Sequence, residues 1–194
     1  MKKKNKYNDF QNKNFFNTFK YFKSAKYKSL VNSMGVILNK KFHYDIIRPG
    51  ISLYGGHYNT DLRKIIKPVI KLKARVLQIK NLEKNEYIGY NQTYKTVKPM
   101  TIAILGIGYA DGISRKLSNR GKVFYKKKKF NIIGRVSMDS TTIDITKYKT
   151  IIKKGIYMEL INHEYDIEKM AKECDTISNE ILTSISNRVK RSYI

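Results

Sequence analysis

The sequence is poor in cysteine and proline, with one cysteine and three prolines among its 194 residues. Because Cys174 stands alone, no disulfide can form within the chain, and neither a CxxC motif nor a His/Cys cluster is present to hold zinc. These absences exclude a disulfide-rich scaffold and a zinc domain, so we expect no metal site. A chain without a disulfide suits a reducing compartment, and we expect it in the cytoplasm.

Long apolar runs are missing too. No segment approaches the roughly 18 apolar residues of a membrane-spanning helix, and the N-terminal stretch "MKKKNKYNDFQNKNFF" lacks the apolar centre of a signal peptide. We therefore expect no membrane association. With 41% hydrophobic residues, a chain of this length can still bury one good core or two small ones.

Acidic residues are scarce: 15 Asp and Glu stand against 40 Lys and Arg, giving a formal net charge of +25. Such a charge attracts nucleic acid, anionic membrane surfaces and acidic metabolites. The cations are mostly lysines accompanied by many Asn, Ile and Tyr residues, whereas Gly, Ala and Pro are few, which an AT-rich coding bias also produces. Since net charge governs solubility and non-specific association, we expect only non-specific contact with nucleic acid.

The first third of the sequence predicts short α/β pieces. Phenylalanines recur along residues 10–28 at spacings that place them on one face of a helix, a stripe typical of core packing. The stretch "SLVNSMGVIL" then predicts a short buried strand running into a helix, and "YDIIRPGISLYG" predicts another strand interrupted by Pro49 and Gly50. Two such units are typical of a parallel α/β structure.

From about residue 65 the sequence predicts a compact, mainly β domain. Segments such as "VIKLKARVLQIKNL" and "MTIAILGIGYADG" combine period-two alternation, β-branched residues and Gly or Asn turns. The lysine run 126–129 lies between two such segments and is expected to be a solvated hairpin tip. The last segment, 166–189, predicts a helix with Asp166 as its N-cap and Glu168 in its first turn.

Five segments, in order, resemble alanine racemase, a family built from an N-terminal (β/α)8 barrel that binds pyridoxal 5′-phosphate and a C-terminal β-domain. They are "NSMGVIL" at 32–38, "IIRPGISLYG" at 46–55, "GIGYADGISR" at 106–115, "GRVSMDSTTIDIT" at 134–146 and "EILTSISNRVKRSY" at 180–193. The resemblance implies that residues 1–62 are the end of the barrel and residues 63–194 the β-domain. It also implies interconversion of L-alanine and D-alanine, which supplies a cell-wall precursor.

The resemblance implies a cofactor site in the earlier segments. Ser33 would offer its hydroxyl to the cofactor phosphate, and Gly50 and Ile51 would offer backbone N–H groups to the same oxygens. Glycine suits this position because it lets the backbone approach closely. Arg48 would face the pyridine nitrogen. Taken without the resemblance, Gly50 is an ordinary turn after Pro49 and Arg48 a surface cation.

The later segments would supply the groups that act on the substrate. Tyr109 matches the family's acid/base tyrosine, which serves one face of the substrate Cα while the cofactor lysine serves the other. Met138 would offer its backbone N–H to the substrate carboxylate, with Asp139 shaping the same loop. By family habit Tyr109 and Met138 reach into the pocket of a second subunit, so we expect a homodimer. Without its glycine-rich context, Tyr109 is a tyrosine packed beside a turn.

Parts of the family pattern are missing. No lysine lies in a KANAYG-like motif, and Ser137 and Asn187 stand where many members have cysteine and a phosphate-binding tyrosine. Residues 1–62 can supply only about two of a barrel's eight strand–helix units. We therefore expect a truncated or split racemase that needs a complementing N-terminal half and is not competent alone. The alternative is a non-enzymatic basic β-domain that binds nucleic acid or other polyanions.

Overall fold

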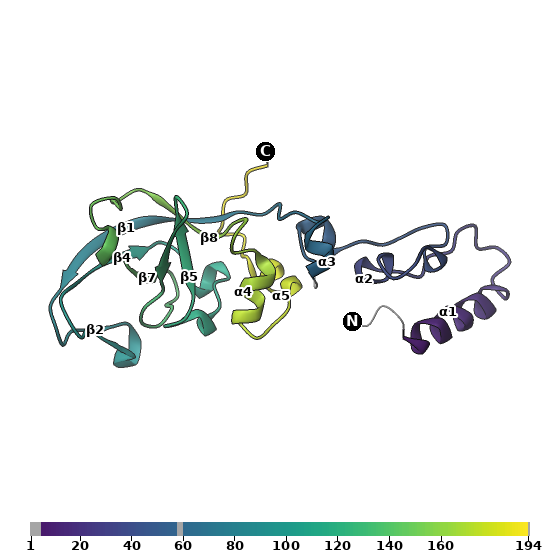
Figure 1. Ribbon diagram of the computed structural model, residues 1–194, viewed down its shortest axis with the longest axis horizontal. Coiled ribbons are helices and arrows are strands. Elements are labelled where there is room, and N and C mark those ends of the chain that lie inside the picture. Colours follow the sequence, from purple (N-terminus) through teal and green to yellow (C-terminus); the bar gives the residue numbers. More distant parts are fainter. Residues whose placement is uncertain (1–4, 58–59, 194) are drawn as a thin grey trace. The chain divides into compact units, whose positions relative to one another are not determined.

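The computed structural model describes residues 5–57 and 60–193 (Figure 1). The chain divides into two compact units, Met1–His57 and Tyr58–Ile194, and each is described by itself. Whether residues 1–62 form the end of a (β/α)8 barrel stays a prediction, as does the predicted domain boundary after residue 62.

Among its described residues the first unit holds four helical elements. These are α1 (Lys6–Phe19), α2 (Ser33–Val36) and the 3-10 helices η1 (Lys40–Phe42) and η2 (Ile51–Tyr54). Helix α1 begins where the Asn5 side chain accepts a hydrogen bond from the Tyr7 N–H, because an N-cap oxygen satisfies an orphan donor of the first turn.

The phenylalanine stripe forms a helix only as far as Phe19, and its expected place in a core is wrong. No residue of α1 is buried, and Phe10 and Phe16 are 56% and 50% exposed. Phe15 has a ring partner, Tyr44, at a centroid distance of 5.0 Å. The stripe stays largely exposed because this small unit offers it little else to pack against.

The two strand-like runs of the first unit meet in one parallel bridge, between Asn32 and Arg48. Next to it the Arg48 N–H donates to the Val31 carbonyl at 2.9 Å. The parallel direction agrees with the sequence prediction, but the predicted strands are reduced to this single bridge. Pro49 follows directly, and because proline has no N–H it ends the pairing.

The second unit is mainly β, as the sequence predicted, and its main sheet has the order β6-β5-β8-β1-β4-β7 with every pair antiparallel. The strands are β1 (Leu72–Leu82), β4 (Met100–Leu105), β5 (Lys122–Tyr125), β6 (Lys128–Asn131), β7 (Thr141–Asp144) and β8 (Tyr157–Ile161). A small sheet pairs β2 (Tyr87–Ile88) with β3 (Tyr94–Lys95). The helical elements are α3 (Thr60–Arg63), α4 (Ile167–Glu173), α5 (Ser178–Ser184), η3 (Tyr90–Gln92), η4 (Tyr109–Asp111), η5 (Arg115–Leu117) and η6 (Thr146–Tyr148).

The two edges of the main sheet come together. Ile132, just after β6, forms an antiparallel bridge with Ile143 of β7, and the Ile133 N–H donates to the Thr142 carbonyl at 3.0 Å. The sheet thus curls onto itself and pairs its exposed edges. Its core consists of fully buried aliphatic and aromatic side chains, among them Val76, Leu105, Phe130, Ile143 and Leu160.

The predicted hairpin at residues 126–129 is confirmed, with a two-residue turn. Lys126 and Lys127 have φ of 46° and 64°, the left-handed pair that suits the twist of a tight hairpin, while the next two lysines already belong to β6. The predicted helix after Asp166 is also present, and the Asp166 side chain accepts from the Lys169 N–H at 3.0 Å. It is broken into α4 and α5 at Asp175, whose φ is 51°.

Among the described residues no helix is both long and apolar enough to cross a membrane.

Candidate functional site

A tight turn follows β4 and presents Tyr109. The Gly108 N–H donates to Asp111 Oδ2 at 2.9 Å inside the protein, and the Ile113 N–H returns to the Gly108 carbonyl at 3.1 Å. Gly112 closes the turn with a φ of 104°, a conformation that glycine adopts without strain. The chain is therefore folded back within five residues, and the Tyr109 side chain is left 43% exposed.

The Tyr109 turn is joined by its backbone to the loop that carries Met138. The Tyr109 N–H donates to the Ser137 carbonyl at 2.9 Å and the Ala110 N–H to the Met138 carbonyl at 3.0 Å. A Cβ on Gly108 would lie 2.3 Å from both of these carbonyl oxygens. The absence of a side chain at Gly108 is thus what lets the two loops lie against each other.

The Met138 loop is itself held in a narrow bend. The Ser137 N–H donates to the Ser140 carbonyl at 3.0 Å, and the Ser137 hydroxyl lies 2.8 Å from both that carbonyl and the Ser140 hydroxyl. The Ser137 hydroxyl is therefore a hydrogen-bonding group that closes the bend. Met138, at its tip, is exposed.

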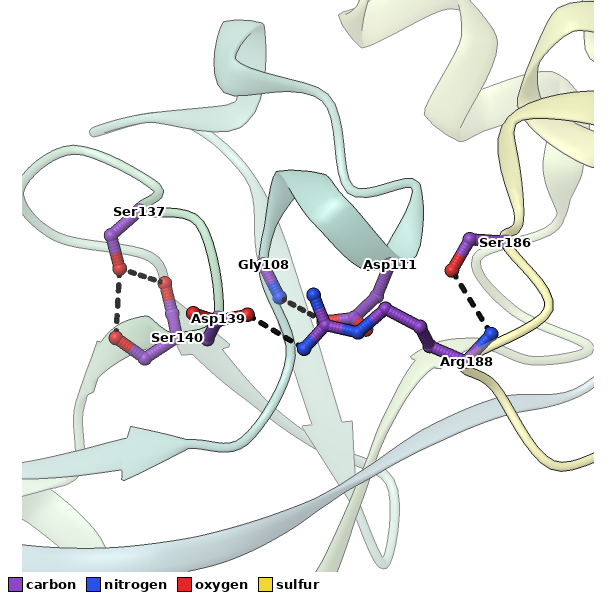
Figure 2. Close-up of polar contacts among 7 residues, drawn as sticks. All are labelled: Gly108, Asp111, Ser137, Asp139, Ser140, Ser186 and Arg188. Atoms are coloured by element: carbon purple, nitrogen blue, oxygen red, sulfur yellow. Dashed lines mark hydrogen bonds and ion pairs between the residues drawn. The ribbon is translucent and has the colours of Figure 1, made fainter.

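Arg188 brings a positive charge to both loops, a feature that the sequence analysis missed. Figure 2 shows the Arg188 side chain reaching toward Asp139 and Asp111. Its Nη2 lies 2.6 Å from Asp139 Oδ1 and its Nε lies 3.4 Å from Asp111 Oδ1. The hydrogen bond to Asp139, followed by the charge of Asp111, raises the pKa of the Arg188 guanidinium. Nearby, the Arg115 guanidinium lies 5.9 Å from the centroid of the Tyr109 ring, within cation–π range.

A cavity of about 270 Å³ adjoins the Tyr109 turn. It lies between this turn and the α4–α5 corner, and its lining includes Tyr109, Ile113, Cys174, Thr176, Ile181 and Ser184. Burial raises the pKa of the Cys174 thiol, which disfavours the thiolate. The cavity gives the turn an open side next to the candidate acid/base residue.

In the first unit the structure brings Ser33 together with Gly50 and the start of η2. Ser33 is buried, and its Oγ accepts from the Gly50 N–H at 2.8 Å and from the Ser52 N–H at 3.4 Å. A Cβ on Gly50 would meet nothing within 4 Å, so the backbone is open at this point. The Ser52 Oγ is buried without a hydrogen-bond partner in the part of the chain that the structure describes.

Arg48 lies on the bridge that leads to Ser33, but its guanidinium is engaged elsewhere. Nη1 donates to the carbonyl and the hydroxyl of Ser29 at 2.9 and 2.5 Å, and Nη2 to the Leu30 carbonyl at 3.4 Å. Asn187 is exposed and belongs to the second unit. The predicted residues thus form two groups, one around Ser33, Gly50 and Ile51 and one around Tyr109 and Met138.

The second unit is thus a curled antiparallel β-domain. A turn framed by glycines presents a tyrosine from it, beside a second loop. The family model described as "Alanine racemase, C-terminal domain" matches residues 69–193. The chain belongs to this family.

Individual relatives agree over nearly the whole chain. An alanine racemase of Brucella ovis is 42% identical over 180 residues, which is 86% of this chain and 46% of that protein. One of Rickettsia canadensis is 40% identical over 190 residues, covering 97% of this chain and 52% of its own length. The chain therefore spans about half the length of the curated relatives it matches.

Solved structures give the same result. Alanine racemase from Bartonella henselae, with covalently bound pyridoxal phosphate, superposes with a TM-score of 0.80 at 38% identity over 88% of this chain and 47% of that one. Alanine racemase from Streptomyces coelicolor superposes with a TM-score of 0.87 at 26% identity, over 95% of this chain and 51% of that one. The family and the mainly β C-terminal domain expected from the sequence are confirmed.

Proposed function

We propose that this chain supplies the tyrosine-bearing part of an alanine racemase site that interconverts L-alanine and D-alanine. The observation that supports this most directly is the paired Tyr109 and Met138 loops, joined by two backbone hydrogen bonds across Gly108. A loop pair held this way keeps an exposed phenol in a fixed place, which acid/base catalysis requires.

Racemisation needs one group to remove the Cα proton and another to return it on the opposite face. We assign one face to the Tyr109 hydroxyl and the alanine carboxylate to the backbone N–H of Met138. The base on the other face is a lysine that we assign to a complementing N-terminal half, because no lysine of this chain lies in a KANAYG-like motif. Tyr109 and Met138 would complete the pocket of a second subunit in a dimer.

The residues of the first unit fit a phosphate-bearing cofactor. In its contacts with Gly50 and Ser52 the Ser33 hydroxyl is an acceptor, so its own proton can be donated to a phosphate oxygen. The unpartnered Ser52 Oγ and the open backbone at Gly50 lie beside it, and the Ile51 N–H is the next donor along η2. In the second unit, Asn187 can donate a hydrogen bond to a phosphate oxygen.

Pyridoxal 5′-phosphate, when bound, would withdraw electrons from Cα and make its proton easier to remove. Arg48 would donate to the pyridine nitrogen. The three bonds to Ser29 and Leu30 occupy only some of its five N–H donors. A guanidinium keeps its own protons and so donates to that nitrogen without protonating it.

The test is reconstitution with the lysine-bearing N-terminal half of one of the matching racemases. Activity is read as deuterium incorporation at Cα, starting separately from L-alanine and D-alanine in D₂O. We expect no exchange from the chain alone and exchange from the mixture. Tyr109→Phe removes the hydroxyl and keeps the ring, so it should lower exchange by about 10²- to 10⁴-fold, chiefly in the direction in which the tyrosine removes the proton.

Tyr157→Phe is the matched control, because it removes a hydroxyl from another exposed tyrosine, in β8. It should leave the rates unchanged. A Tyr109→Phe mixture as fast as its parent would contradict the assignment of Tyr109, and racemase activity from the unmixed chain would contradict the need for a second half.

A further inference from the structure

Arg188 touches both loops that carry the proposed substrate-binding groups. We propose that Arg188 is a positioning residue, which holds the Tyr109 turn against the Met138 loop and so sets the place of the phenol. The inference rests on the proposed function of Tyr109. Its physical part, the coupling of the two loops, can be measured without any catalysis.

One side of the coupling is the carboxylate of Asp111. Oδ2 accepts the Gly108 N–H at 2.9 Å and Oδ1 faces Arg188 Nε at 3.4 Å, so this carboxylate links the inner bond of the turn to the arginine. Its side chain is only 11% exposed. Burying a carboxylate costs free energy unless it is paired, and Arg188 provides the opposite charge.

The other side is Asp139, which directly follows Met138. Its Oδ1 lies 2.6 Å from Arg188 Nη2, and its side chain is 60% exposed. Figure 2 shows the guanidinium lying between the two aspartates, which come from separate loops. Nε and Nη2 are separate donors of one planar group, a fork that an ammonium cannot reproduce.

The arginine is placed by the backbone that carries it. The Arg188 N–H donates to Ser186 Oγ at 3.3 Å, and the Ser186 N–H donates to the Asp111 carbonyl at 3.3 Å. Two residues before Ser186, the Ser184 carbonyl lies close to Gly112. A Cβ on Gly112 would be 2.4 Å from the Ser184 carbonyl oxygen. The segment 184–188 is thus laid along the turn, and its arginine reaches from there to the facing loop.

Removing the guanidinium leaves two carboxylates close together. Both contact the same group, at 2.6 and 3.4 Å, so without it Asp111 and Asp139 repel each other across the two loops. This repulsion pulls on the Tyr109–Ser137 and Ala110–Met138 hydrogen bonds. Because Tyr109 is the first residue of η4, a turn that opens at this point moves the phenol.

Hydrogen exchange of backbone amides in the full chain tests this coupling. The amides of Tyr109 and Ala110 report on the two bonds between the loops, and the amides of β4 report on the unfolding of the domain. In Arg188→Ala we expect exchange at Tyr109 and Ala110 to rise by about tenfold or more, since hydrogen bonds to charged groups are worth roughly a tenfold factor or more, with β4 unchanged. In Arg188→Lys the exchange rates of these two amides should lie between those of the parent and those of Arg188→Ala.

Two further variants sharpen the result. Arg191→Ala is the matched control, because it removes the same charge three positions on, from a guanidinium whose Nη2 donates to the Ile185 carbonyl; it should leave both loop amides unchanged. Adding Asp139→Asn to Arg188→Ala removes the repulsion and should recover part of the protection. If exchange speeds up equally at the loop amides and the β4 amides, Arg188 stabilises the whole domain and the proposal is wrong. Unchanged exchange at the loop amides would also overturn it.

The reconstituted enzyme gives the catalytic readout. Arg188→Ala should lower kcat more than it raises KM, and Arg188→Lys should recover part of kcat. If Tyr109→Phe leaves the racemase activity unchanged while the amide-exchange results hold, the proposed function fails and the loop coupling stands. Opened loops with an unchanged kcat would instead overturn the positioning role.

Discussion

At the scale of single residues, the candidate site depends on places where a side chain is absent. Gly108 allows two carbonyl oxygens of the facing loop to come within 2.3 Å of where its Cβ would be. The tyrosine beside it gains a defined position from this contact, because its own N–H is one of the two that bridge the loops. The glycines around Tyr109 therefore serve the placement of the phenol as well as the turn.

Gly108→Ala should separate the two loops. The new Cβ meets backbone oxygens, which cannot move without breaking the Tyr109 and Ala110 hydrogen bonds, so we expect a loss of about 1–3 kcal/mol in the free energy of unfolding, as for other overpacked sites. Urea unfolding measures it. Gly106→Ala is the control, since the three atoms nearest to its Cβ would all belong to the exposed Leu77 side chain, at 3.0–3.3 Å, and it should cost less than about 1 kcal/mol.

The sequence predicted roles for Tyr109 and Met138 but none for Arg188. The tyrosine stands in a local pattern of glycines, which can be read within a few residues. Arg188 acts on Asp139, which is 49 positions away, and nothing local distinguishes it from the other members of a set of 40 basic residues. Its role depends on the tertiary path of the last segment and could not be predicted without the fold.

At the scale of elements, strands were easier to predict than the limits of helices. In β1 the buried positions Leu72, Ala74 and Val76 alternate with exposed ones, so period-two burial was visible in the sequence. The break between α4 and α5 was not, because it depends on a left-handed Asp175 and on the Thr176 N–H closing onto the Ala171 carbonyl at 2.9 Å. Likewise, the phenylalanine stripe indicated a helix but could not indicate what would cover it.

Helix α4 is attached to the sheet through Tyr165, and this attachment should be sensitive to alkali. Its ring packs on Phe124 at 5.5 Å and its hydroxyl donates to Glu173 at 2.6 Å. Burial, followed by the hydrogen bond to Glu173, raises the pKa of Tyr165 above the ordinary value of 10.0. The stabilisation is therefore present below about pH 10, where an unfolded tyrosine keeps its proton, and is lost as the pH rises above that value.

Tyr165→Phe should remove this part of the pH dependence. Above about pH 10 the free energy of unfolding of the parent should fall by up to about 1.4 kcal/mol more per pH unit than that of the variant. Near pH 7 the variant should be less stable by about 1.5–3 kcal/mol, because it loses a hydrogen bond to a carboxylate. Urea unfolding at both pH values measures the difference. Tyr157→Phe, at an exposed position of β8, is the control; equal alkaline slopes for parent and Tyr165→Phe would refute the prediction.

At the scale of the whole molecule, the charge of +25 does not by itself define a nucleic-acid site. Three exposed aromatic rings, those of Phe16, Tyr27 and Tyr87, already have a lysine of the same chain above them, at 5.0–5.5 Å. Single-stranded nucleic acid is held by stacking on free aromatic faces. Rings covered by lysine favour the interpretation of the lysines as a general surface bias.

The two compact units should differ in their resistance to protease. Lysines occur throughout both, so trypsin finds potential sites everywhere and its pattern reports which backbone opens. In Met1–His57 the buried apolar side chains among the described residues are Val31, Phe42 and Ile51, whereas the second unit contains a closed sheet with an extensive core. We expect the first unit to be cut early and the second to persist as a fragment.

A core variant shows whether this pattern reflects the stability of each unit. Ile143→Ala empties a fully buried position of β7 and should cost the second unit about 2–5 kcal/mol. The C-terminal fragment should then disappear faster while early cuts in the first unit keep their rate, as followed by mass spectrometry of the digest. A resistant N-terminal piece beside a degraded C-terminal one would contradict the expectation, because it would place the greater stability in the unit with the smaller core.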